Sequence, residues 1–73
     1  MDRALIEHNL KLAETHVAAS ERIVRQQREL VAQLERDGHS TELARKLLDS
    51  YEQALRVHVA GRDRLRRSLT NET

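Results

Sequence analysis

The chain has 73 residues and a formal net charge of +1, from 13 basic and 12 acidic residues, and it contains one tyrosine but no cysteine, proline, phenylalanine or tryptophan. This composition excludes disulfides, cysteine-ligated metals and cysteine nucleophiles, and it favours helices over strands. No apolar run approaches the ~18 residues that cross a bilayer, and the first residues do not resemble a secretory leader, so we expect a cytoplasmic protein without membrane contact.

The first predicted helix covers about residues 2–36. Hydrophobic residues recur in it at spacings of three and four, which is the pattern of a helix with one buried face. A second apolar row runs beside the first, so the apolar arc is about 160° wide, more than a two-stranded seam requires. The two rows contain Ile6, Leu10, Val17, Ile23, Val24, Leu30, Val31 and Leu34.

The segment from Asp37 to Ser40 predicts a tight link between two helices. Gly38 can adopt the left-handed conformation that ends many helices, and Ser40 is a good N-cap for the next helix, with Thr41 as the competing cap. Because the link is short, the two helices must run antiparallel.

The second predicted helix covers about residues 40–69 and is followed by a frayed tail, residues 70–73. Acidic residues four positions before basic ones, such as Glu52–Arg56 and Asp63–Arg67, predict ion pairs within its outer face. Its apolar stripe is also wide. The stripe contains Leu47, Leu48, Tyr51, Leu55, Leu65 and Leu69, which complete the predicted self-association core begun by the first helix.

One hairpin cannot cover two wide apolar arcs, and a chain of this length buries too little surface to be stable alone. The sequence therefore predicts an all-α, single-domain protein: an antiparallel two-helix hairpin that forms a homodimeric four-helix bundle. A trimer, or a domain-swapped dimer in which residues 37–40 straighten, stays open as an alternative.

Polar residues interrupt the stripes and are expected to face each other, Ser20 near His58 and Gln27 near Tyr51. The favoured interpretation is that these layers fix register and partner number. The alternative is that Ser20 and His58, with His16, form a functional site. Gly61 predicts a close helix contact opposite Val17.

Sites for chemistry are not indicated. The four histidines include no pair at i,i+4, and no His-Glu-x-x-His motif, phosphate loop or strained serine turn is present. His8 lacks the neighbouring acidic residue and downstream proline of phosphotransfer hairpins. We therefore expect no catalytic residue, no metal, no cofactor and no small-molecule substrate.

A basic cluster near the end of the second helix supports an alternative function. Its arginines are spread around the helix, without the stacking aromatics or reading motif of most nucleic-acid binders. The cluster consists of Arg56, Arg62, Arg64, Arg66 and Arg67.

A family resemblance covers most of the chain. The segments Glu21–Leu30, Leu34-Glu35-Arg36-Asp37-Gly38-His39, Tyr51-Glu52 and His58–Leu65 resemble a group of short alphaproteobacterial proteins that have no assigned activity. The resemblance implies the helical hairpin and transfers no site residue.

The sequence thus favours a self-associating structural or protein-interaction module whose exposed edges bind a partner helix. The alternative is a small nucleic-acid-associated regulator that uses the basic cluster.

Overall fold

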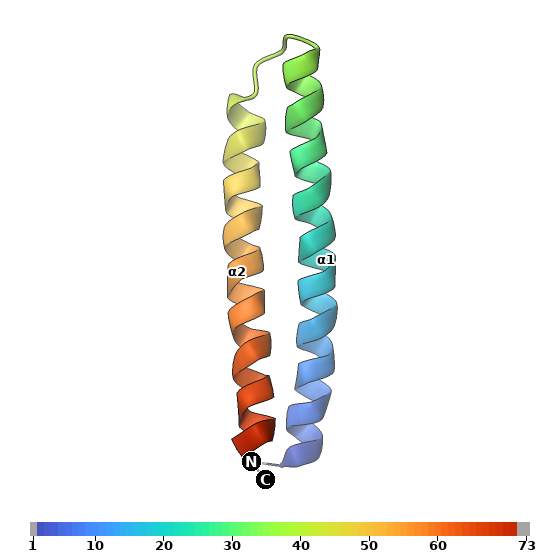
Figure 1. Ribbon diagram of the computed structural model, residues 1–73, viewed down its shortest axis with the longest axis vertical. Helices are drawn as coiled ribbons and strands as arrows, with labels where there is room; N and C mark the ends of the chain where they lie inside the picture. Colours follow the sequence, from blue (N-terminus) through green and yellow to red (C-terminus); the bar gives the residue numbers. More distant parts are fainter. Residues whose placement is uncertain (1, 72–73) are drawn as a thin grey trace.

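The computed structural model describes residues 2–71, and within this range the chain forms two long helices and no strand. Helix α1 (Arg3–Arg36) and helix α2 (Glu42–Asn71) run antiparallel as a hairpin about 55 Å long and 14 Å by 13 Å across (Figure 1). The all-α, two-helix prediction is confirmed. The short link lies at one end, and the start of α1 and the end of α2 lie at the other.

Capping interactions explain where α1 begins and ends. The Asp2 carboxylate accepts a hydrogen bond from the Ala4 backbone N–H at 3.0 Å, so Asp2 is the N-cap. At the other end Gly38 has φ +73°, and the N–H groups of Gly38 and His39 donate to the Glu35 and Leu34 carbonyl oxygens. This is the Schellman arrangement, and it requires the conformational freedom of glycine.

Helix α2 differs from its predicted bounds at both ends. It begins at Glu42, with Thr41 in the N-cap position: the Thr41 carbonyl accepts the first helical hydrogen bond, from Arg45 N–H at 2.8 Å. The link is longer than predicted because the backbone of His39 still bonds to α1, which leaves Ser40 and Thr41 to complete the crossing.

The predicted fraying of residues 70–73 is wrong for Thr70 and Asn71, which are helical. No proline or glycine follows Gly61, so nothing in the covalent chain stops the helix there. The Thr70 hydroxyl donates to the Arg66 carbonyl oxygen one turn back. The remainder of the predicted tail, residues 72–73, lies outside the described residues.

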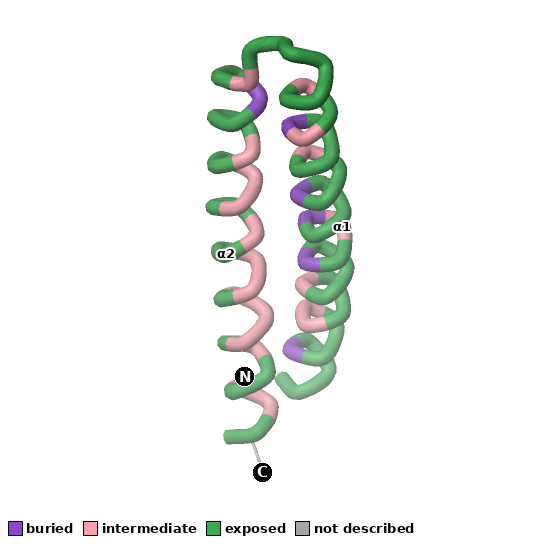
Figure 2. The backbone as a smooth tube through the Cα atoms, turned by 45° about the horizontal axis from the view of Figure 1, so that its top comes forward, coloured by how far each residue is buried: buried purple, intermediate pink, exposed green. Residues whose placement is uncertain are grey.

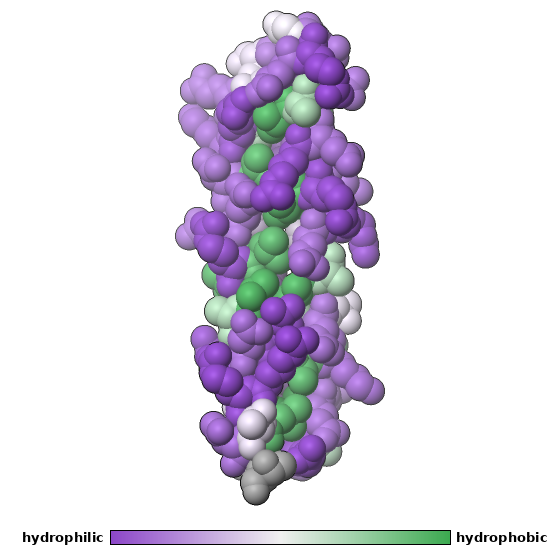
Figure 3. Space-filling model, viewed as in Figure 1, coloured by the Kyte–Doolittle hydropathy of each residue, from purple (hydrophilic) through white to green (hydrophobic). Residues whose placement is uncertain are grey.

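The buried residues form a single row between the helices (Figure 2). Most of them come from α1, and Ala44 is the contribution of α2. Polar surface borders a narrow apolar strip along the length of the hairpin (Figure 3). A row one side chain thick leaves both flanks in contact with solvent. The buried residues are Ile6, Val17, Ser20, Val24, Val31 and Ala44.

The other predicted core positions are only partly covered in the single hairpin. Three of them, Ile23, Leu30 and Leu47, are exposed. The rest are half-buried: Leu10, Leu34, Leu48, Tyr51, Leu55, Leu65 and Leu69.

The hairpin is too extended to resemble a compact domain of its length. Its radius of gyration is 16.6 Å, against about 11 Å for a compact chain of this length. It exposes 5485 Å² of surface, whereas a compact monomer of 8.5 kDa exposes about 4,700 Å². The excess is roughly 800 Å².

Gly61 does not serve the close helix contact that its position suggested. A Cβ atom placed on Gly61 would meet nothing within 4 Å, so in the single hairpin the neighbouring helix is not near enough to require glycine. The prediction of a tight contact with Val17 is therefore wrong for the isolated hairpin.

Candidate functional site

One side of the hairpin is closed by charge pairs between the helices. Arg28 Nη2 lies 2.7 Å from Glu52 Oε2, and Arg66 Nη2 lies 3.2 Å from Glu14 Oε2. Glu35 pairs with Arg45 nearer the link. On each helix the members of this set are spaced by seven or fourteen residues, so they share one face. We call this side the ion-paired face.

The ion pairs differ from those expected within α2. Glu52 pairs with Arg28 of the other helix, and Asp63 pairs with its neighbour Arg62 at 3.1 Å. The sequence carries the signal for the ion-paired face, since opposite charges stand at matching seven-residue intervals on both helices. Glu52 and Asp63 each have an arginine four positions later in α2, so spacing alone favoured the local partner.

The opposite side of the hairpin is hydrophobic. Large aliphatic side chains between 40% and 71% exposed lie there on both helices. Two shallow hollows lie between the helices on this side. Leucines at seven-residue intervals extend the hydrophobic surface toward the end of the hairpin away from the link, which we call the open end. We call this side the apolar face, and it consists of Leu5, Leu12, Ala19, Ile23 and Leu30 of α1 with Leu43, Leu47 and Ala54 of α2.

The hollow nearer the link is lined mostly by aliphatic side chains, with Gln27 and Ser40 as its polar members. Leu30 and Leu34 of α1 border it on one side, and Leu43, Ala44 and Leu47 of α2 border it on the other. Gln27 donates from Nε2 to the Ala44 carbonyl oxygen at 2.9 Å. That acceptor lies two turns from Tyr51, the residue that Gln27 was expected to face.

The second hollow, at mid-length, holds the remaining polar residues of the stripes. Ser20, Tyr51 and His58 line it together, and His16 joins them from α1. The ring centroids of His16 and His58 are 5.6 Å apart, with the rings tilted by 55°. Ala19, Ile23 and Ala54 complete the lining, so the imidazoles lie beside two hydroxyl-bearing side chains and three aliphatic ones, and we call this site the histidine hollow.

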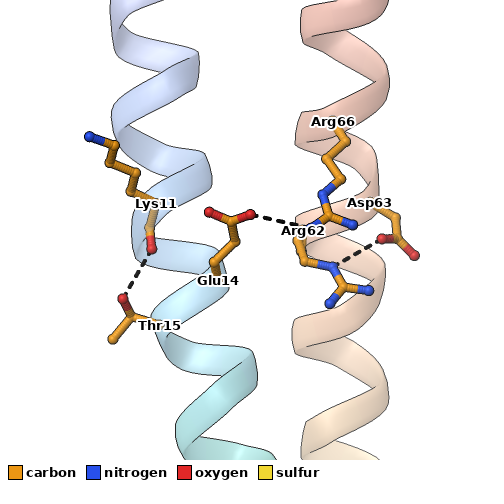
Figure 4. A network of polar contacts seen from close by, with 6 residues as sticks. All are labelled: Lys11, Glu14, Thr15, Arg62, Asp63 and Arg66. Atoms are coloured by element: carbon orange, nitrogen blue, oxygen red, sulfur yellow. Dashed lines mark hydrogen bonds and ion pairs between the residues drawn. The ribbon is translucent and has the colours of Figure 1, made fainter.

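The basic cluster of α2 is partly neutralised. Arg62, with 24% of its side chain exposed, donates to Asp63, and Arg66 reaches across to Glu14 of α1 (Figure 4). Arg56, Arg64 and Arg67 are exposed. Carboxylates therefore stand beside the two arginines nearest the hairpin seam, which does not favour a continuous positive surface.

Comparison with known proteins adds no identity. No protein-family model, curated protein or solved structure matches the chain. The resemblance to short alphaproteobacterial hairpin proteins therefore stays a prediction.

Two further properties concern only residues 2–71. Within this range no three His, Cys, Asp or Glu side chains are placed to hold a metal ion within one chain. Neither of the two helices combines the length and the apolar character needed to cross a bilayer.

Proposed function

We propose that the chain is a self-associating helical module, in which the apolar faces of two hairpins pack together and form a four-helix bundle with a structural or protein-interaction role. The observation that carries the proposal is the asymmetry of the hairpin. Ion pairs cover one side, while the other presents Ile23, Leu30 and Leu47 to solvent. Large contiguous apolar surfaces of this kind mark sites of association.

The area of the hairpin agrees with a second copy as the occupant. Its surface exceeds that of a compact monomer by roughly 800 Å², and a standard interface buries about 800 Å² per partner. A symmetric pair uses the same face twice, so no additional partner chemistry is needed. A helix from another protein would cover only the strip between α1 and α2.

The nucleic-acid alternative receives less support. Arg62 and Arg66 are engaged by Asp63 and Glu14, and the acidic residues along the ion-paired face interrupt any positive surface there. A binder that depends on phosphate contacts uses arginines free to meet phosphates.

Sedimentation equilibrium on the full chain tests the proposal. We expect a species of twice the 8.5 kDa chain mass at micromolar concentration and a melting temperature that rises with chain concentration. A helical, cooperatively melting monomer would overturn the proposal.

A charged pair of substitutions locates the interface. The double variant Leu30→Glu, Leu47→Glu places two carboxylates in the apolar face, so we expect it to sediment as a monomer. The matched control is the double variant Ala18→Glu, Ala60→Glu, at two exposed alanines that line neither hollow and lie outside the apolar face, and it should sediment as the wild type does. Loss of association in the control but not in the leucine variant would place the interface elsewhere.

A further inference from the structure

The histidine hollow lies close to the middle of the hairpin. The midpoint of α1 (Arg3–Arg36) falls between Ala19 and Ser20, and that of α2 (Glu42–Asn71) falls between Arg56 and Val57. At 1.5 Å per residue, His16 and His58 are about 5 Å and about 2 Å from these midpoints. Both are displaced toward the open end, so they share one level.

The spacing of the two rings suits a shared metal ion. A zinc–nitrogen bond of about 2.0 Å and tetrahedral geometry place the centroids of two ligating imidazoles about 5 Å apart. The observed separation is 5.6 Å, with the rings on different helices and tilted rather than stacked. No charged residue is among the described residues that line the hollow, so no cation there opposes binding.

Two histidines are too few for a closed zinc site, which takes four ligands. A second hairpin packed on the apolar face would supply the other two. A two-fold axis parallel to the helices keeps both histidine pairs at the same level, and an axis perpendicular to them does so when it passes through the level of the histidines, about 2–5 Å from mid-length. Ala19 and Ala54 beside the pair leave room for close approach.

We propose that His16 and His58 of two hairpins form a four-histidine layer in the bundle that binds one divalent transition-metal ion of the zinc type. This inference rests on the proposed self-association, because one chain holds only half of the layer. The layer would also fix the register of the two hairpins, since a slip along the helices separates the pairs.

Equilibrium dialysis of the full chain against zinc sulfate tests the layer. We expect one zinc per two chains for the wild type. The variant His16→Ala, His58→Ala should bind at least tenfold more weakly, whereas the matched control His8→Ala, His39→Ala, at two exposed histidines, should bind as the wild type does. Circular dichroism establishes that both variants are helical.

Several outcomes would overturn the layer: no zinc binding by the wild type, a stoichiometry of one zinc per chain, or equal loss in both variants. Sedimentation of the chain in EDTA and in zinc distinguishes failure of the metal layer from failure of the proposed self-association. A dimer in EDTA that binds no zinc removes the metal site and leaves self-association intact. A folded monomer under both conditions removes both.

Discussion

The two faces of this hairpin are built from the same seven-residue repeat but differ in chemistry. On the ion-paired face, side chains such as Arg28 and Glu52 reach across the seam and satisfy each other. On the apolar face, Leu30 and Leu47 border a hollow that no residue from 2 to 71 fills. The comparison teaches that a hairpin can complete one flank with its own residues and leave the other for a partner.

The largest expected effect concerns the buried row that lies between the ion-paired face and the apolar face. Val24 is buried between them, so Val24→Asp places an unpaired charge in the seam and should lower the free energy of unfolding by about 3 kcal/mol or more. Urea unfolding followed by circular dichroism measures it. Ala60→Asp, at an exposed alanine outside the apolar face, is the control, and equal effects of the two would mean that the buried row is not the core.

The next effect tests how far the apolar face extends. Leu12 is 47% exposed and lies one heptad before Ala19, toward the open end. If the second hairpin covers this end, Leu12→Glu should weaken dimerisation about ten- to a hundredfold, from the loss of about 1.5–3 kcal/mol of leucine burial. Analytical ultracentrifugation over a dilution series measures the constant. An unchanged constant, equal to that of Ala18→Glu on an exposed position, would confine the interface to the half nearer the link.

A smaller effect of opposite sign is expected at Gly61. A Cβ there meets open space in the hairpin, so Gly61→Ala should stabilise α2 by about 0.5–1 kcal/mol through its higher helix propensity. Thermal melts at fixed chain concentration check this. A destabilised variant would show that the backbone of another copy packs against this glycine in the assembly.

The smallest effect belongs to the ion-paired face. The Arg28–Glu52 pair is largely exposed on its arginine side, so a double-mutant cycle to alanine should give a coupling of about 0.2–1 kcal/mol. In 1 M NaCl the coupling should nearly vanish, because salt screens exposed charges. A coupling above this range that persists in salt would mean that the pair is buried in the assembled bundle.

The fold was predictable because its signals are local. Gly38, the helical periodicity and the cap residues lie within a few positions of the features they determine, and all four helix bounds came within two residues of their predicted positions. The side-chain partners across the two helices were harder to predict. Gln27 bonds to Ala44, and a carboxylate such as Glu52 has more than one arginine within reach. Spacing does not rank partners of similar reach.

The candidate site could be only partly predicted for a different reason. A wide apolar arc indicates that a second surface exists, but Ile23 and Val24 are adjacent hydrophobic residues, and only the position of α2 decides which is buried and which stays exposed. The approach of His16 to His58 depends equally on that position, because the two residues are 42 positions apart on different helices.

The start of α1 and the end of α2 lie at one pole of the hairpin, and the link lies at the other. A segment joined to the start of α1 and a segment joined to the end of α2 would therefore both project from the pole opposite the link. In a bundle of two parallel hairpins, four attachment points would gather at that pole, whereas antiparallel hairpins would hold two pairs of attachments about 55 Å apart, the length of the rod. In such a bundle, the relative direction of the two copies would decide whether the attached segments stand together or about 55 Å apart.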